Sequence, residues 1–451
     1  TELPTVGAHG IAVADLNGDG RPEVIFGGYL NDSTYNVNST IYWGQAGGTY
    51  GVTYTVGART DLPTIGAAGV AVTDLNNDGR PEVIFTNFYN GSTYNVNSYI
   101  YWGQAGGPYG VQHSAGARTD LPTSGAIGLA VADLNGDGWP EVIFANTANN
   151  DSYIYWGQAG GAYGVNYSVG ARTDLPTSGA SGVAVADLNG DGRPEIIFAN
   201  ATGDSYIYWG QAGAPYGVTY TVGARTNLPG NGAQKASVAD LNNDGQRDVV
   251  VQNYQGGFTR VFWGPLPTSG TATNYWDRSQ VFGFRGLSLS DLNGDGRLDL
   301  LTGRQGTDPS SNYWFGGTSG RVYFHNGNNS APYNAAPSFD LPVQTSPGAY
   351  ASFGPGRGTN GDWFSQPRPV YGTAFPNYGA LESMVMDSGQ AGTAWQSVIA
   401  STTIAAGTGI TLFVAASDNL AALNNPTWTQ VGAMGNGSWT QSLSGVSGRY
   451  A

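Results

Sequence analysis

The pattern of hydrophobic and polar positions repeats along most of the chain. In its third copy, an apolar stretch at residues 128–134 runs into an acidic loop, and further apolar stretches lie at 141–146 and 152–157. A glycine-rich turn at 158–164 then leads to a fourth stretch at 166–176. Short stretches rich in β-branched and aromatic residues, separated by glycine, predict four strands in each copy. The proline near the end of the fourth stretch suits an outer edge strand.

The acidic loop recurs six times as Asp-Leu-Asn-(Gly/Asn)-Asp-Gly-x-x-(Glu/Asp), at intervals of 59, 59, 54, 53 and 51 residues. The copies begin at Asp15, Asp74, Asp133, Asp187, Asp240 and Asp291. A unit of about 50 residues is one small sheet that cannot bury its faces alone, so neighbouring units must pack together. Four antiparallel strands in each unit predict an all-β fold, a β-propeller.

The predicted propeller occupies residues 1–374. Residues 343–374 lack the acidic loop, and we favour a divergent seventh blade there, with a six-bladed ring and a linker as the alternative. The N-terminal phrase Thr1–Thr5 matches the fourth stretch of the other copies. We therefore expect this strand to pair with a C-terminal part of the propeller and to cover an open sheet edge. From 375 to 451 the pattern changes to that of a small β-sandwich, which stops where another strand is due.

Tyr–Trp pairs recur in the first four of the six units. The pairs are Tyr42–Trp43, Tyr101–Trp102, Tyr155–Trp156 and Tyr208–Trp209, and each is followed by a tyrosine in the next turn, at Tyr50, Tyr109, Tyr163 and Tyr216. Alternation along a strand predicts that one ring of each pair packs between blades while the other faces outward. Packing between blades is the favoured interpretation. If the rings were exposed instead, they would form repeated sugar-binding sites.

The first two copies also carry about five extra residues, at 31–38 and 90–97, which should project from one face.

Oxygen side chains at positions 1, 3, 5 and 9 of the loop, with glycine at position 6, are the pattern that calcium requires. The three carboxylates of each loop account for 18 of the 32 acidic residues, so six bound Ca²⁺ ions would bring the net charge from −14 to about −2. A single such phrase could be only an Asx turn. Six copies in register favour calcium.

The remaining composition excludes several classes of protein. An acidic chain whose only lysine is Lys235 is unsuited to nucleic acid. The absence of cysteine excludes disulfides, and suits a secreted or cell-surface bacterial protein. The most apolar stretch, residues 397–416, is broken by Ser, Thr and Gly-Thr-Gly, and predicts two strands in place of a membrane span.

The repeated loop within a four-stranded period resembles the FG-GAP/VCBS repeat family, whose best-known member is the propeller of integrin α subunits. The resemblance covers residues 1–342 and is closer to bacterial secreted members, because Trp-Gly-Gln-Ala-Gly stands where integrins have Phe-Gly…Gly-Ala-Pro. In that family, side chains at loop positions 1, 3, 5 and 9 and the carbonyl at position 7 bind calcium. The resemblance therefore implies six calcium sites, formed by Asp15, Asn17, Asp19, Arg21, Glu23; Asp74, Asn76, Asp78, Arg80, Glu82; Asp133, Asn135, Asp137, Trp139, Glu141; Asp187, Asn189, Asp191, Arg193, Glu195; Asp240, Asn242, Asp244, Gln246, Asp248; and Asp291, Asn293, Asp295, Arg297, Asp299.

We expect no catalytic residues. The repeated Asp61, Asp120 and Asp174 each lie two residues after an arginine and should pair with it, and the three histidines show no ligand spacing. The predicted function is an extracellular, calcium-stabilised structural or adhesion module that binds protein or glycan at a cell surface and that can assemble with itself through its chain ends. A multivalent lectin is the alternative, and a polysaccharide-active enzyme comes third.

Overall fold

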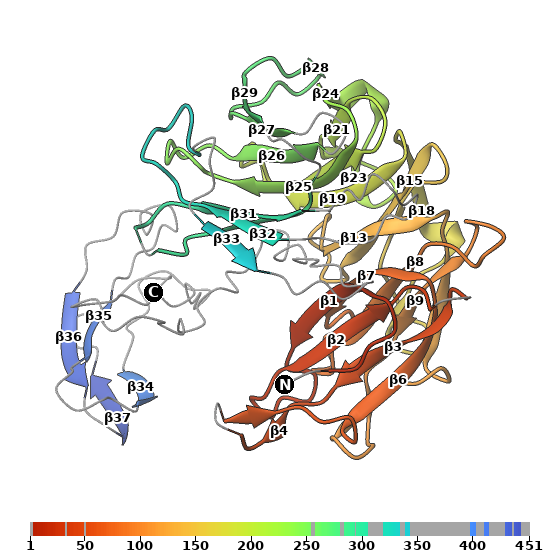
Figure 1. Cartoon of the computed structure of the whole chain (residues 1–451), viewed down its shortest axis with the longest axis vertical. Helices are drawn as coiled ribbons and strands as arrows, with labels where there is room; N and C mark the ends of the chain where they lie inside the picture. The colour runs from red at the N-terminus through yellow and green to blue at the C-terminus, as the bar shows by residue number, and fades with distance from the viewer. Residues whose placement is uncertain are drawn as a thin grey trace. The chain divides into compact units, whose positions relative to one another are not determined.

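The chain is all-β in its computed structural model (Figure 1). The structure describes residues 3–31, 34–48, 51–253, 258–279, 284–293, 295–304, 319–333, 339–342, 397–402, 410–414, 429–434 and 437–442. Two compact units divide the chain, Thr1–Gly361 and Asp362–Ala451. Apart from two three-residue turns, Val169–Ala171 and Val222–Ala224, the described regular elements are strands.

Six antiparallel sheets of four consecutive long strands follow one another in the described part of the first unit. Their strands are β1 (Ala8–Ala14), β2 (Glu23–Gly28), β3 (Asn36–Tyr42) and β6 (Arg59–Ile65); β7 (Ala67–Thr73), β8 (Glu82–Asn87), β9 (Asn97–Tyr101) and β12 (Arg118–Pro122); β13 (Ala126–Ala132), β14 (Glu141–Asn146), β15 (Asp151–Tyr155) and β18 (Arg172–Pro176); β19 (Ala180–Ala186), β20 (Glu195–Asn200), β21 (Ser205–Tyr208) and β24 (Arg225–Leu228); β25 (Ala233–Ala239), β26 (Asp248–Asn253), β27 (Phe258–Phe262) and β29 (Tyr275–Ser279); and β30 (Phe284–Ser290), β31 (Asp299–Arg304), β32 (Ser319–Tyr323) and β33 (Phe339–Pro342). The short β28 (Gly270–Thr271) adds a parallel edge to the fourth sheet.

The predicted strands of one repeat are confirmed with one correction. The stretch at 166–176 is not a single strand, because β18 begins only at Arg172. Before it, β16 (Gln158–Ala159) and β17 (Val165–Asn166) form a small hairpin, and similar hairpins are β4 (Gln45–Ala46) with β5 (Val52–Thr53), β10 (Gln104–Ala105) with β11 (Val111–Gln112), and β22 (Gln211–Gly213) with β23 (Gly217–Thr219). Glycines with positive φ, such as Gly161 and Gly164, allow the tight reversal.

The first strands of consecutive sheets pack against one another in chain order, from β1 through β7, β13, β19 and β25 to β30 (Figure 1). The approach is close enough to demand glycine, because a Cβ on Gly182 would lie 2.6 Å from the carbonyl oxygen of Gln234. Four-stranded sheets repeated in this way form a β-propeller, as predicted. The proposed seventh blade at 343–374 lies outside the described residues.

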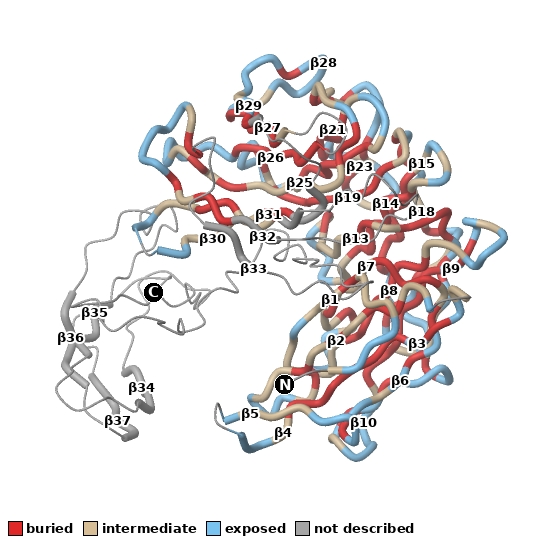
Figure 2. Tube along the Cα trace, viewed as in Figure 1, coloured by how far each residue is buried: buried red, intermediate tan, exposed pale blue. Residues whose placement is uncertain are grey.

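The repeated aromatic rings pack between the sheets, so the favoured interpretation is confirmed. Trp43, Trp102 and Trp156 stack on a hairpin tyrosine of the following sheet, with ring centroids 4.4–4.6 Å apart, in the pairs Trp43–Tyr109, Trp102–Tyr163 and Trp156–Tyr216. The prediction that one ring of each pair faces outward was wrong, because both rings of Tyr42–Trp43 are fully buried. Buried residues run along the strands of the sheets, as at β8 and β14 (Figure 2). The tyrosine is drawn inward because its hydroxyl donates to a backbone carbonyl, that of Pro122 for Tyr155 at 2.5 Å. Tyr50 lies outside the described residues.

The N-terminal segment forms no strand over Leu3–Thr5, and Thr1 and Glu2 lie outside the described residues. The sixth sheet has its own fourth strand, β33. Pairing of the N-terminus with a later part of the propeller therefore remains a prediction. Its Pro4 carbonyl accepts a hydrogen bond from Tyr42, just as Pro63 and Pro176 accept from Tyr101 and Tyr208. The segment thus lies where the end of a preceding fourth strand would lie.

In the second unit, β34 (Ser397–Thr402) pairs with β37 (Gly437–Ser442), and β35 (Ile410–Val414) pairs with β36 (Thr429–Met434). The two strands predicted within 397–416 are confirmed by β34 and β35. The β-sandwich and its boundary at 375 remain predictions. Among the described residues, no helix has the length and apolar character needed to cross a membrane.

Candidate calcium-binding loops

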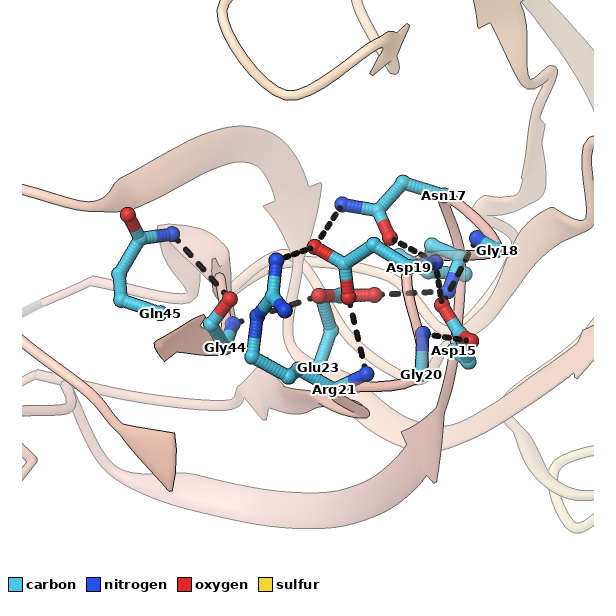
Figure 3. Close-up of polar contacts among 10 residues, drawn as sticks. Asp15, Asn17, Gly18, Asp19, Gly20, Arg21, Glu23, Gly44 and Gln45 are labelled. Carbon is cyan, nitrogen blue, oxygen red and sulfur yellow. Dashed lines mark hydrogen bonds and ion pairs between the residues drawn. The ribbon is translucent and has the colours of Figure 1, made fainter. Parts of the chain in front are cut away.

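Each acidic loop connects the first strand of a sheet to the second. Figure 3 shows the polar contacts of the first loop. The loop reverses the chain because its first carboxylate accepts backbone N–H groups. In the first copy, Asp15 Oδ1 accepts from Gly18 at 2.8 Å and Oδ2 accepts from Gly20 at 2.8 Å. Gly20 has a φ of 80°, which glycine adopts without strain. The bond from the position-6 glycine to the first aspartate recurs in the other five copies at 2.8–3.0 Å.

The acidic residue at position 9 is fully buried in all six copies: Glu23, Glu82, Glu141, Glu195, Asp248 and Asp299. One of its oxygens accepts from the N–H at loop position 2, as Glu23 does from Leu16 at 2.7 Å. The other accepts, in the first copy, from Gly44 at 3.3 Å, just beyond the third strand. In the third and fourth copies this second oxygen, Oε1 of Glu141 and of Glu195, is buried and makes no hydrogen bond of good geometry, although the N–H groups of Gly157 and Gly210 still lower the pKa of these two acids.

Burial raises the pKa of the four position-9 glutamates and of Asp248, and the neighbouring loop aspartates add to the shift. The pKa rises to about 7 for Glu23 and Glu195 and to about 8 for Glu82 and Glu141. For Asp248 it rises to about 6. The backbone N–H groups lower the pKa and offset only part of the effect of burial. The folded protein therefore disfavours the charged form of these carboxylates.

The side chain of arginine at position 7 forms an ion pair that was not predicted from the sequence, which implied only a carbonyl ligand at that position. Arg21, Arg80 and Arg193 pair with the position-5 aspartate of their own loop at 2.6–2.7 Å. The third loop has Trp139 here, and Arg297 of the sixth bonds Asn329 at 3.0 Å. The recurrence of arginine in four of six copies was a signal for this ion pair. Because the pairs are exposed, each contributes little to stability.

The second loop also contacts the next sheet. Asn76 Nδ2 donates to the carbonyl of Tyr163 at 2.9 Å, and Asn77 Nδ2 donates to that of Gly138 at 3.1 Å. Tyr163 stacks on Trp102, so this loop and the inter-sheet ring stack share one residue. The second loop is therefore joined by hydrogen bonds to the third sheet.

The residues fit calcium by chemistry. All the proposed donors are oxygens, and the position-9 acid offers a buried oxygen that in two copies makes no hydrogen bond of good geometry. In the described part of the chain, no three His, Asp or Glu side chains converge closely enough to hold a metal ion. The loop aspartates are instead occupied by backbone N–H groups and, in three copies, by arginine.

Three repeated aspartates and two histidines outside the loops have structural partners in the described part of the chain. Asp61, Asp120 and Asp174 pair with the arginine two residues earlier at 2.6–3.0 Å, as expected. His9 bonds the Ala68 carbonyl and His113 the Pro81 carbonyl.

Fold and loops together define a repeat protein of the β-propeller class. The family described as FG-GAP-like repeat matches residues 15–85, 133–198, 187–251 and 240–302, and the FG-GAP repeat matches 282–325. These matches include all six acidic loops and cover more than half of the chain. The chain belongs to the FG-GAP repeat family.

Two solved structures are similar in part, and no curated protein matches the chain. The crystal structure of BBS1N in complex with ARL6DN, soaked with lead, is 11% identical and has a TM-score of 0.42. The same complex soaked with mercury is 12% identical and has a TM-score of 0.40. Each comparison covers 73% of this chain and 82% of the other.

Proposed function

We propose that this chain is an extracellular structural or adhesion module whose propeller is stabilised by six calcium ions. The observation that carries the proposal is the fully buried acid at position 9 of every loop, beside two aspartates. Burying a carboxylate without a balancing cation is costly, and a divalent ion bound by the loop oxygens would remove that cost. The residues that would hold the ion are those at positions 1, 3, 5 and 9, with the carbonyl at position 7.

The extracellular location is supported by calcium chemistry and by composition. Loops of this kind saturate most easily where calcium is millimolar, outside the cell. The chain also has no cysteine to be oxidised there and a net charge of −14, which calcium would largely neutralise. A protein or glycan at the cell surface is the proposed partner.

The calcium proposal is tested by thermal unfolding in millimolar Ca²⁺, in EGTA, and in Mg²⁺ as the matched control. A ligand that binds only the folded form stabilises by about 2.7 kcal/mol per site at a hundred-fold excess over Kd. We expect a large loss of melting temperature in EGTA, recovery with Ca²⁺ and less recovery with Mg²⁺. An unchanged curve in EGTA would contradict calcium stabilisation.

A non-enzymatic role is proposed because the repeated carboxylates are committed to loops and ion pairs. We expect no release of reducing ends or unsaturated uronates from alginate, pectin or neutral polysaccharides. Turnover by the calcium-loaded protein would overturn this part of the proposal while leaving the metal sites untouched.

A further inference from the structure

The extra residues of the first two repeats bring together a group of aromatic rings that occurs once in the described chain. The inserts connect β2 to β3 and β8 to β9. In an antiparallel sheet this connection lies at the opposite end from the β1–β2 connection, so the inserts are remote from the acidic loops. We call the group the tyrosine platform, and it comprises Tyr29, Tyr35, Phe88, Tyr89 and Tyr94.

The five rings form a closed chain of contacts across two sheets. Tyr35 from the first sheet lies edge-on to Tyr89 from the second, with centroids 5.0 Å apart. Tyr89 lies 4.6 Å from Tyr94, and Phe88 links Tyr94 back to Tyr29. Tyr94 is 43% exposed, and the other four rings are half-buried. The platform therefore presents aromatic surface to solvent, unlike the buried rings between the blades.

Hydrogen bonds within the inserts hold the platform in place. Asn90 Oδ1 accepts from the backbone N–H groups of Ser92 and Thr93, both at 2.8 Å. The carbonyls of Tyr35 and Tyr94 accept from Gly66 and Gly125, each at 2.7 Å. A surface ordered before binding loses less conformational entropy when a ligand arrives.

The described polar side chains of the inserts are amides and hydroxyls. The ring of His9 lies 5.1 Å from that of Tyr29, and Arg59 and Asp61 line a pocket beside Asn36 and Asn38. Residues 29–38 and 88–97, which contain the inserts, read Tyr-Leu-Asn-Asp-Ser-Thr-Tyr-Asn-Val-Asn and Phe-Tyr-Asn-Gly-Ser-Thr-Tyr-Asn-Val-Asn. Asp32, which lies outside the described residues, is the only charged residue among them. Exposed asparagines follow the rings, at Asn36, Asn38, Asn95 and Asn97. In the third and fourth repeats the same connection has only four residues, 147–150 and 201–204, and none of them is aromatic.

We propose that the tyrosine platform binds a neutral carbohydrate. The C–H faces of a sugar ring pack on exposed aromatic rings, while its hydroxyls exchange hydrogen bonds with amide and tyrosine groups. The described residues of 29–38 and 88–97 carry no charged side chain, which fits a ligand without charge. This site is single and lies on the inserts, in contrast to a lectin site repeated between every pair of blades.

The test is calorimetry of the calcium-loaded chain with four neutral hexasaccharides, from cellulose, xylan, mannan and laminarin, and with an acidic hexagalacturonate. We expect at least one neutral hexasaccharide to bind and the acidic one to bind more weakly. Tyr94→Ala should weaken that binding at least ten-fold, which corresponds to about 1.4 kcal/mol. Tyr94→Phe, which retains the ring, should weaken it less.

Tyr275→Ala is the matched control, because Tyr275 is 41% exposed but lies on the fifth sheet. Its binding should be unchanged, and melting curves check that all variants fold. The proposal is overturned if no neutral hexasaccharide binds, if the acidic one binds best, or if Tyr94→Ala and Tyr275→Ala behave alike. Capture of a protein that is lost in Tyr94→Ala, with no sugar bound, would assign the platform to protein docking.

Discussion

The first and fourth sheets are built from nearly the same residues, yet they are buried to different degrees. Strand β1 reads Ala-His-Gly-Ile-Ala-Val-Ala and β19 reads Ala-Ser-Gly-Val-Ala-Val-Ala. Val13 of β1 is 62% exposed, whereas Val185 at the same position of β19 is 3% exposed. Their acidic loops, by contrast, are alike, with an Arg–Asp pair at 2.6 Å in one and 2.7 Å in the other. The geometry of the loop is determined by its own residues, whereas the burial of the strand residues depends on the neighbouring sheet.

The difference in exposure between Val13 and Val185 follows from the sheets that pack against them. The fourth sheet shares a core cluster with the third, in which Val185 and Phe198 pack with Ile143 and Trp156. Val13 and Phe26 belong to none of the core clusters in the described part of the chain. One face of the first sheet is therefore the position where a preceding sheet would pack.

The largest effect is expected from truncating one phenylalanine in each sheet. Phe198→Ala should lower the free energy of unfolding by about 3–5 kcal/mol, because it empties a fully buried site between two sheets. Phe26→Ala should cost clearly less, because Phe26 is already partly exposed. Urea unfolding of the two variants measures the difference. Equal losses would mean that another sheet covers the first one.

The loops should respond alike in the two sheets if their geometry is local. Replacing Asp19 and Glu23, or Asp191 and Glu195, with alanine should each reduce bound calcium from six ions to five. The lost stability should be similar in the two variants, about 2.7 kcal/mol at a hundred-fold excess of calcium over Kd. Native mass spectrometry counts the ions, and the double variant Asp137→Ala, Glu141→Ala tests the third loop in the same way. Loss of several ions at once would show that the loops are coupled around the propeller.

The sequence predicted what depends on local residues and missed what depends on neighbours. It predicted β14 with both of its boundaries, because the acidic loop and the glycines mark each strand. It did not predict that Tyr42 is buried, since that depends on a carbonyl of the chain that precedes the sheet. It also missed the tyrosine platform, because the rings of 29–35 and 88–94 meet only when two sheets pack. The residues that offer oxygen ligands in the loops could be identified from the sequence, whereas calcium binding itself remains a prediction.

A smaller effect is expected in the second sheet, where a histidine replaces a tyrosine. Tyr54 and Tyr220 donate to the carbonyls of Pro22 and Pro194, and His113 bonds that of Pro81 at 2.9 Å through Nε2. His113 Nδ1 is buried without a partner. His113→Tyr should therefore raise the free energy of unfolding by about 1–3 kcal/mol, the cost of such an unsatisfied group.

The same variant should alter the response to pH. Burial lowers the pKa of His113 below its usual 6.5, so the folded protein binds a proton less readily than the unfolded chain. Its contribution to stability is present above pH 6.5 and is lost as the pH falls towards the folded pKa. Thermal unfolding at pH 8 and pH 5 should show a larger gain from His113→Tyr at pH 5. A gain equal at both pH values would mean that the histidine does not titrate on unfolding.

The smallest effect concerns the N-terminal segment and returns to the first sheet. Tyr42 donates to Pro4 as Tyr208 donates to Pro176, although Pro4 belongs to a segment that forms no strand over Leu3–Thr5. If this segment is the outer strand of a preceding blade, Tyr42→Phe and Tyr208→Phe should each cost about 1 kcal/mol, the net worth of one hydrogen bond. Deleting residues 1–6 should cost at least as much as Tyr42→Phe, and adding Tyr42→Phe to the deletion should cost nothing further. Melting temperature and oligomeric state measure both changes. A deletion that alters neither would mean that the Pro4 contact closes no blade and joins no second copy.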